Sequence, residues 1–427
     1  MSAGRHFLQI PGPTNIPDRI LRAMDRPIPD HRGRELPALV EEVTAGLKQV
    51  FQTRYGEIVL YPGSGTGAWE ASLVNTLSPG DRILSFNIGY FSQLYAECAR
   101  RFGILVDEVE LPWGSGVPAE TVYDRLSRDR RHAYRAVIVV HNETSTGVTS
   151  DVKAIREAID AAAHPALFLV DTVSSLGCMD FRFDEWKVDV ALAGTQKGLM
   201  LPPGMAVLCV SPRAIAESAR ATAPRYFFDW RPMLEETRRG YFPYTPATLL
   251  LFGLREALRM LFEEGLTNVF ARHAKLAEGV RRAVRAWGLS LLCRNPAEYS
   301  NSLTAVVVPD GADADRVIQI AEQLQLSLGT GLGRLKGKVF RIGHLGSLNE
   351  LEVLATVAGV ELALTLAGVD IPVGAGVVAC EEYFLQSHLR GSLAGGAAGE
   401  PSGGCGAPVG RAHSRGVRDG GRESSCA

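Results

Sequence analysis

Six short apolar runs, separated by longer helical patterns, constrain the fold of this chain more than any other feature of its sequence. They are EIVLY at 57–61, RILSF at 82–86, AVIVV at 136–140, LFLV at 167–170, VALA at 190–193 and MAVLCV at 205–210. A strand that is buried on both faces gives a continuous apolar run of this kind, whereas a half-exposed strand alternates apolar and polar residues. The pattern therefore predicts an α/β protein with helices around a mostly parallel sheet.

The length and the later part of the chain predict a second, smaller domain. At 427 residues the chain exceeds the size at which a single hydrophobic core keeps growing. From about residue 255 it shows long helical patterns, then strand-like segments and a final helix near 348–366, which is typical of an α+β domain. We expect these segments, given in chain order: an N-terminal arm at 1–20, a large domain at 21–260, a small domain at 261–385 and a Gly-rich, disordered tail at 386–427.

Composition excludes several classes of function. The chain is 46% hydrophobic and 22% charged, and its formal net charge of -2 gives no attraction for nucleic acid. Residues 353–366 are apolar but too short to cross a bilayer, and the first residues contain no apolar run of signal-peptide length. The seven cysteines lack metal-binding spacing, so we expect reduced thiols and no metal site. A cytoplasmic protein with small-molecule partners, or copies of itself, fits best.

Two polar motifs follow predicted strands. The glycine-rich turn 63–67, with the sequence GSGTG, lies between a strand and a helix, where backbone N–H groups and the helix dipole favour a phosphate. Taken alone, it is equally explained as a tight strand-to-helix turn. Asp171 follows the run LFLV, at the sheet edge where ligands of open α/β sheets bind. Taken alone, it is better explained as a helix cap or a solvated carboxylate.

Lys197 follows the next apolar run along the chain. It is flanked by Gly194, Gly198 and the Pro-Pro-Gly segment at 202–204, so it lies in a constrained turn. Desolvation in such a turn lowers the pKa of a lysine and makes its amine a usable nucleophile. A phosphate cradle, a buried carboxylate and a lysine on one edge match the needs of pyridoxal phosphate: a phosphate anchor, a counterion for the ring nitrogen and a Schiff-base amine. Together they predict that Lys197 and Asp171 are catalytic.

Seven strings in the chain then give a family resemblance. They are IPGPTNIPDRILRAM at 10–24, GSGTGAWEASLVNTLSPGD at 63–81, HNETSTGVTSD at 141–151, FLVDTVSSLG at 168–177, GTQKGLMLPPG at 194–204, YFPYTPAT at 241–248 and VFRIGHLGSLNE at 339–350. Over about residues 5–385 the chain resembles class V aminotransferases of fold type I, and within them bacterial serine–glyoxylate aminotransferases. The resemblance implies a seven-stranded type of sheet sandwiched by helices. The family's pattern ends near residue 385, and the tail has no counterpart in it.

The resemblance assigns cofactor-binding roles by position. Ser64, Gly65 and Thr66 hold the phosphate, with Gln196 beside it. A second group lies around the pyridine ring, namely Phe91 stacked on one face, Val173 packed on the other and Thr144 near the phenolic oxygen. Thr245, with Tyr241 or Phe242 nearby, is implied to reach the phosphate of a second subunit, so that the active unit is a homodimer.

The resemblance also assigns the substrate site. Arg341, in the strand-like VFRIGH, matches the arginine that binds the substrate carboxylate, and a guanidinium grips a carboxylate through two parallel hydrogen bonds. An arginine inside an apolar strand is otherwise expensive to bury. Gly12, in an arm segment that lines the pocket, is expected to leave room for a small substrate side chain.

These assignments predict one leading function and three alternatives. The leading one is transamination of L-serine and glyoxylate to hydroxypyruvate and glycine, a serine-cycle reaction run as two ping-pong half-reactions. Alanine–glyoxylate and ureidoglycine–glyoxylate transamination are alternatives within the family. A nicotinamide-dependent dehydrogenase is the alternative from another class, although it has no need of Lys197 or Asp171.

Overall fold

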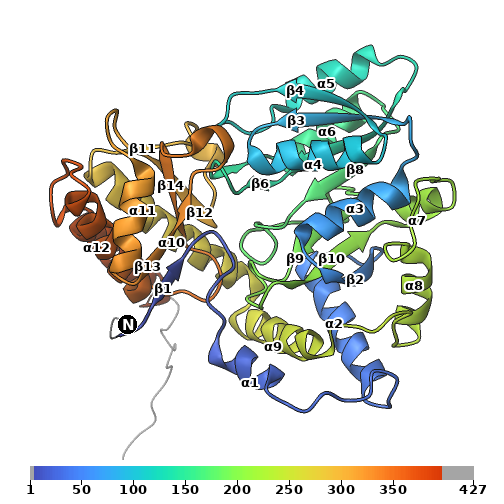
Figure 1. Cartoon of the computed structure of the whole chain (residues 1–427), viewed down its shortest axis with the longest axis horizontal. Coiled ribbons are helices and arrows are strands. Elements are labelled where there is room, and N and C mark those ends of the chain that lie inside the picture. Colours follow the sequence, from blue (N-terminus) through green and yellow to red (C-terminus); the bar gives the residue numbers. More distant parts are fainter. Residues whose placement is uncertain (1–3, 397–427) are drawn as a thin grey trace, which may run out of the picture. The chain divides into compact units, whose positions relative to one another are not determined.

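All six apolar runs form strands of one seven-stranded sheet in the computed structural model, which describes residues 4–396 (Figure 1). In spatial order these strands are β2 (Glu57–Gly63), β10 (Gly204–Val210), β9 (Val190–Gly194), β8 (Leu167–Asp171), β5 (Tyr134–Val140), β3 (Arg82–Asn87) and β4 (Leu105–Glu110). The sequence did not predict β4. It is an edge strand with the sequence LVDEVE, and its mostly half-buried side chains include three acidic ones, so they do not give an apolar run.

The strand directions bring three chain segments to one edge of this sheet. Strands β9, β8, β5, β3 and β4 run parallel to one another. Strand β10 is antiparallel to both β9 and β2, so β2 points the same way as the parallel strands. The carboxyl ends of β2, β8 and β9 therefore lie together, which places the turn after Gly63, Asp171 and the turn after Gly194 at one edge.

Helices cover both faces of the sheet (Figure 1). One face packs against α2 (Leu36–Val50), α5 (Ala119–Arg128), α6 (Val152–Ala161) and α9 (Thr248–Glu264), with α1 (Asp18–Met24) on α9. The other packs against α3 (Gly65–Thr76), α4 (Tyr90–Arg101), α7 (Pro212–Ser218) and α8 (Trp230–Arg238). Successive residues of β10, such as Val207 and Leu208, enter opposite cores, which explains why these strands are apolar at every position.

A second sheet has the order β1 (Phe7–Gln9), β13 (Leu326–Thr330), β14 (Val339–Gly343), β12 (Leu303–Val307) and β11 (Ser290–Leu291). Its core also contains α10 (Leu266–Ala286), α11 (Ala314–Gln323) and α12 (Glu350–Leu366). Two short 3-10 helices, at Pro296–Glu298 and Gly333–Leu335, lie between these elements. Strand β1 pairs in parallel with β13, so the N-terminal segment is part of the sheet formed by the C-terminal region.

The end of the described chain corrects one expectation. The chain divides into two units, Met1–Phe384 and Leu385–Ala427, and helix α13 spans Ala375–Gly396. Residues 386–396, which we expected to be disordered, are therefore helical. The segment 385–390 contains neither Gly nor Pro, so nothing in it stops a helix already under way. The rest of the predicted tail, 397–427, lies outside the described residues. Between residues 4 and 396, no helix has the length and apolar character needed to span a membrane.

Candidate active site

Nine of the predicted residues line one cavity of about 130 Å³ at the carboxyl edge of the seven-stranded sheet. These nine are Ser64, Gly65, Thr66, Phe91, Thr144, Asp171, Val173, Gln196 and Lys197. Three further residues that we did not predict, Trp69, Val140 and Asn142, also line it. The structure thus brings together segments that lie more than a hundred residues apart in the chain.

At one end of the cavity, β2 leads into α3 through Ser64, whose backbone is extended. The side chain of Ser64 makes no capping hydrogen bond to α3, so the first-turn N–H groups are available to an anion. A Cβ atom on residue 65 would lie 2.8 Å from Val173 Cγ2, which explains the glycine there. The Oε1 atom of Gln196 is buried and has no hydrogen-bond partner among residues 4–396.

Asp171 ends strand β8 and is 3% exposed. Its Oδ1 accepts a hydrogen bond from Val173 N at 2.7 Å, and its Oδ2 accepts one from Trp69 Nε1, also at 2.7 Å. Burial raises the pKa of Asp171 to about 6, while the two N–H donors oppose that rise. The carboxylate is therefore desolvated but held by fixed donors, as a counterion for a buried cation should be.

Lys197 lies in the turn after β9 and is buried, and its Nζ donates to the carbonyl oxygen of Pro11. Burial, together with the positive charge of Arg341, lowers the pKa of Lys197 to about 8, and the charge of Asp171 opposes this shift. A Cβ atom on Gly12 would lie 2.4 Å from Lys197 Cδ. The room that Gly12 leaves is thus occupied by the lysine side chain in this structure.

Arg341, in strand β14, is a buried cation whose bonds go to backbone carbonyls. Its Nε donates to Thr330 O at 2.8 Å, and its Nη1 donates to Thr144 O at 2.9 Å. Burial lowers the pKa of Arg341 to about 10, and the charge of Glu143 opposes this shift. No acidic side chain in the described part of the chain forms an ion pair with Arg341, so an anionic ligand would be favourable there.

The amino end of helix α4 is held by the loop that follows β5. In the small sheet of β6 (Asn142–Glu143) and β7 (Val148–Thr149), the fully buried Glu143 accepts hydrogen bonds from Phe91 N at 3.3 Å and Ser92 N at 2.9 Å. Ser145 Oγ accepts one from Tyr90 N at 2.9 Å. This loop therefore fixes where α4 begins, and with it the position of Phe91.

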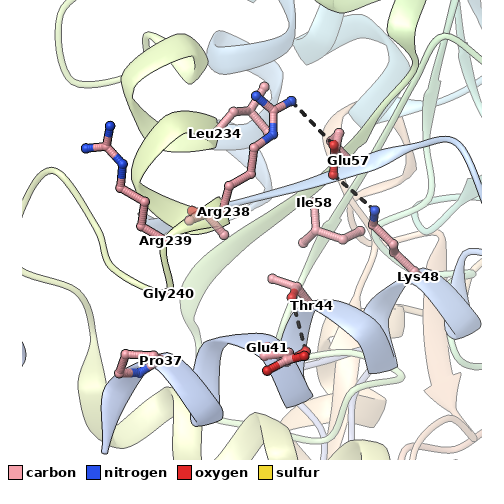
Figure 2. A pocket seen from close by; sticks show the side chains of 11 residues that line it. Pro37, Glu41, Thr44, Lys48, Glu57, Ile58, Leu234, Arg238, Arg239 and Gly240 are labelled. Carbon is pink, nitrogen blue, oxygen red and sulfur yellow. Dashed lines mark hydrogen bonds and ion pairs between the residues drawn. The ribbon is translucent and has the colours of Figure 1, made fainter. Parts of the chain in front are cut away.

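A second hollow, of about 370 Å³, lies at the amino end of β2, between α2 and α8 (Figure 2). Figure 2 shows Glu57 between Lys48 and Arg238, with contacts of 3.0 Å and 3.4 Å. Three charges of this hollow, Lys48, Glu57 and Arg238, are thus paired with one another, and the hollow contains none of the predicted residues. The length of β2 separates it by about 20 Å from the cavity beside Ser64.

The comparisons with known proteins decide the family. The model of the class V aminotransferases matches residues 6–333. The chain is 49% identical to a serine–glyoxylate aminotransferase of Methylorubrum extorquens, over 90% of this chain and 98% of that protein. It is 47% identical to an L-aspartate–glyoxylate aminotransferase of Paracoccus denitrificans, over 88% and 96%. A solved structure, the ureidoglycine–glyoxylate aminotransferase of Bacillus subtilis, has a TM-score of 0.83 and 29% identity, covering 90% and 99%.

This chain is a class V aminotransferase. Its cofactor is pyridoxal phosphate, and the fold type I architecture predicted from the sequence is confirmed. The cavity fits the cofactor, because it combines a helix amino end without an N-cap side-chain bond, a buried carboxylate and a lysine of lowered pKa. Family membership rules out the dehydrogenase alternative.

Two residues predicted to reach a phosphate do not line the cavity of this aminotransferase. Tyr241 is half-buried and packs against the core on the α2 and α9 face of the sheet, and Thr245 is exposed, in the segment between α8 and α9. Phe242, the alternative to Tyr241, is also outside the cavity lining. Within a single chain these side chains are not brought to the other predicted residues, so their assignment to a second subunit remains a prediction.

Sequence reasoning missed Trp69 and Glu143 in this aminotransferase. A signal for Trp69 existed, because it lies one helical turn after Thr66, and a buried indole N–H requires an acceptor. Glu143 directly precedes Thr144, which was assigned, but nothing local shows that its carboxylate reaches another helix. Its partners, Phe91 and Ser92, are more than fifty residues away in the chain.

Proposed function

We propose that this aminotransferase transfers the amino group of L-serine to glyoxylate, giving hydroxypyruvate and glycine in two half-reactions. The observation that carries the proposal is the 49% identity to a serine–glyoxylate aminotransferase over nearly the whole length of that protein. We further propose that it works as a cytoplasmic homodimer in a serine cycle. Three relatives are named as serine–, alanine– and ureidoglycine–glyoxylate aminotransferases. The shared glyoxylate in these names supports glyoxylate as the acceptor.

For the cofactor, we propose that Ser64, Gly65 and Thr66 hold the phosphate through the N–H groups at the α3 amino end and the hydroxyl groups of Ser64 and Thr66, with Gln196 beside them. Phe91 and Val173 would cover the two ring faces and Thr144 would face the phenolic oxygen. Asp171 would keep the ring nitrogen protonated. Tyr241 and Thr245 would reach the phosphate bound by the partner chain. The support is that the first eight of these residues line one cavity.

When bound, pyridoxal phosphate supplies an aldehyde for the amino group and a protonated ring that withdraws electrons from the substrate Cα. Arg341 would grip the substrate carboxylate with the guanidinium edge that its backbone contacts leave free, fixing the direction of the Cα–H bond. Lys197 Nζ would take the proton from the substrate Cα and deliver it to the carbon of the cofactor that carried the aldehyde. Its pKa of about 8 suits an amine that must accept and release a proton near neutral pH. Because Gly12 has no side chain, the N-terminal arm would leave room for the side chain of Lys197.

L-Aspartate is a second candidate donor, because a relative named for it is 47% identical, close to the value for the serine enzyme. The two donors differ in charge. Aspartate brings a second carboxylate, which requires a second cation or several fixed N–H donors in the pocket. Serine brings a hydroxyl that a single hydrogen-bond partner satisfies.

The test is a donor screen with glyoxylate as acceptor. Each amino acid is mixed with the purified cofactor-loaded enzyme and glyoxylate to measure steady-state kcat/KM. In a separate experiment without glyoxylate, the loss of the cofactor's visible absorbance follows the first half-reaction alone. We expect the largest kcat/KM with L-serine, with L-alanine and L-aspartate each at least ten-fold lower. A higher value for L-aspartate would overturn the serine assignment and establish the second candidate. Absence of a half-reaction with any amino donor would overturn the proposed activity itself.

A further inference from the structure

A buried tryptophan donates a hydrogen bond directly to Asp171, the proposed counterion of the cofactor ring. Trp69, in α3, donates its Nε1–H to Asp171 Oδ2 at 2.7 Å, and it is 5% exposed. It also lines the cavity that contains Asp171 and Lys197. We propose that Trp69 is a positioning residue for Asp171, one that fixes the orientation of the carboxylate and keeps it ionised toward the cofactor ring. The inference rests on the proposed role of Asp171.

The carboxylate has two fixed donors, and they differ in origin. Val173 N belongs to the same chain segment and donates to Oδ1 whatever side chain residue 173 carries. The donor to Oδ2 is a side chain from another element, so it can be lost by substitution. With one N–H on each oxygen, the plane of the carboxylate cannot rotate, and a remaining lone pair of each oxygen is left for a further partner.

Trp69 is itself held in place by buried contacts with Tyr95 and Ser72. Its ring stacks on Tyr95, with ring centroids 5.4 Å apart and an interplanar angle of 15°. The Tyr95 hydroxyl lies 2.7 Å from Ser72 Oγ, and Ser72 Oγ donates to Trp69 O at 2.7 Å. Burial raises the pKa of Tyr95 far above its ordinary value, so its hydroxyl stays protonated as a donor. The stack and the bond to Asp171 together restrain the orientation of the indole.

The N–H group supplies an electrostatic effect that packing alone does not. Burial raises the pKa of Asp171, and the bonds from Val173 and Trp69 counter this rise. Without the indole N–H, the carboxylate becomes easier to protonate, and a neutral carboxyl group no longer attracts a protonated ring nitrogen. Binding of the cofactor should then fail at a higher pH than in the parent enzyme.

The test compares Trp69→Phe with Trp230→Phe in the cofactor-loaded enzyme. Trp69→Phe keeps an aromatic ring against Tyr95 and removes the N–H. Trp230, in α8, is fully buried in the same apolar core, and its Nε1 has no hydrogen-bond partner among the residues from 4 to 396. Trp230→Phe therefore removes the same volume without removing a bond. The readouts are the dissociation constant of pyridoxal phosphate and the visible absorption spectrum of the bound cofactor, each measured against pH.

For Trp69→Phe we expect on the order of ten-fold weaker cofactor binding near neutral pH, as a lost bond to a charged group predicts. We also expect the acidic limb of the binding profile, which is the loss of cofactor affinity as the pH falls, to move to higher pH. Trp230→Phe should match the parent enzyme in both. A Trp69→Phe enzyme whose acidic limb stays unmoved would overturn the role of Trp69, even if its affinity fell through lost packing.

Asp171→Asn separates this inference from the function on which it depends. If Asp171→Asn leaves the spectrum and its pH dependence unchanged, the proposed role of Asp171 is wrong. If it changes both while Trp69→Phe changes neither, only the inference about Trp69 is overturned. In the Asp171→Asn background, Trp69→Phe should cause no further change in the acidic limb, since no carboxylate remains to be tuned.

Discussion

At the scale of single residues, the lowered pKa of Lys197 gives a directly measurable consequence. An ordinary lysine amine becomes neutral near pH 10.5, but burial and the charge of Arg341 lower the pKa of Lys197 to about 8. Only the neutral amine attacks the aldehyde of pyridoxal phosphate. The rate at which the apoenzyme captures the cofactor should therefore rise with pH and level off above about 8.

Stopped-flow absorbance of apoenzyme mixed with pyridoxal phosphate measures this profile. Arg341→Gln should move the midpoint to higher pH, because it removes the cation that disfavours protonation of Lys197. Lys197→Ala should show no covalent capture at any pH and no multiple turnover. A midpoint near 10.5 in the parent enzyme would contradict the buried environment described for Lys197.

Arg341 carries a second prediction at this scale, because both substrates of a two-half-reaction enzyme bring a carboxylate to one place. Arg341→Ala should lower kcat/KM for the amino donor and for glyoxylate by similar factors. Each factor should correspond to a loss of about 2 to 4 kcal/mol in transition-state stabilisation. Arg341→Lys should recover only part of this loss, since an ammonium keeps the charge but lacks the planar two-pronged geometry. The bound cofactor's absorbance should persist in both variants. Steady-state kinetics that left glyoxylate unaffected would show that another group binds its carboxylate.

What the sequence revealed about single residues depended on whether their chemistry is local. Lys197, Asp171 and the turn at 63–67 each follow a predicted strand, so strand direction alone brings them together. Trp69 and Glu143 act through partners on other elements, and the bond from Trp69 to Asp171 joins residues about a hundred positions apart. No pattern in one sequence shows such a pairing.

At the scale of elements, burial decided what was predictable. The strands that are covered on both faces have continuous apolar runs, and their predicted bounds agree with the structure to within two residues. Strand β4 lies at an edge, and β1 has only three residues, so neither has such a run. The antiparallel direction of β10 could not be predicted either, because an apolar run does not indicate the direction of its strand in the sheet.

The amino end of helix α4 gives the prediction at this scale. Both oxygens of Glu143 accept hydrogen bonds there, Oε1 from Phe91 N and Oε2 from Ser92 N. In Glu143→Gln one of these acceptors becomes an NH2 group, which cannot accept, so a buried N–H loses its partner. We expect a loss of about 1 to 3 kcal/mol in stability and weaker cofactor binding through displacement of Phe91.

Thermal unfolding and cofactor titration measure the two effects of Glu143→Gln. Asp151→Asn is the matched control, since Asp151 caps α6 by accepting from Ala154 N at 2.9 Å and does not line the cavity. Asparagine caps helices about as well as aspartate, so this variant should resemble the parent in both assays. Unchanged melting and affinity in Glu143→Gln would show that α4 is fixed by other contacts.

At the scale of the whole molecule, hydrogen bonds from residues that line the cavity join the two sheets. The N-terminal segment leaves β1, a strand of the smaller sheet, and its Pro11 carbonyl accepts from Lys197 Nζ, while Thr14 N donates to Gln196 O at 3.1 Å. Arg341, from β14, donates to the loop that holds α4. The residues proposed to bind the cofactor and the arginine proposed to bind the substrate thus come from different sheets, and both must keep their places for one site to form.

The homodimer prediction can be tested by mixing two defective chains. Thr245 is exposed in the single chain and absent from the cavity lining, so a glutamate there should fold normally and repel the phosphate that Thr245 is proposed to reach. Lys197→Ala chains lack the catalytic amine, and each variant alone should be nearly inactive. In a mixed dimer, one site combines Lys197 from the Thr245→Glu chain with Thr245 from the Lys197→Ala chain, and is therefore wild-type. Mixing with subunit exchange should restore about a quarter of the parent activity, because half of the randomly paired dimers are mixed and each has one intact site of two. If Thr245 instead served the cavity of its own chain, no intact site would form, and the mixture would stay as inactive as its components.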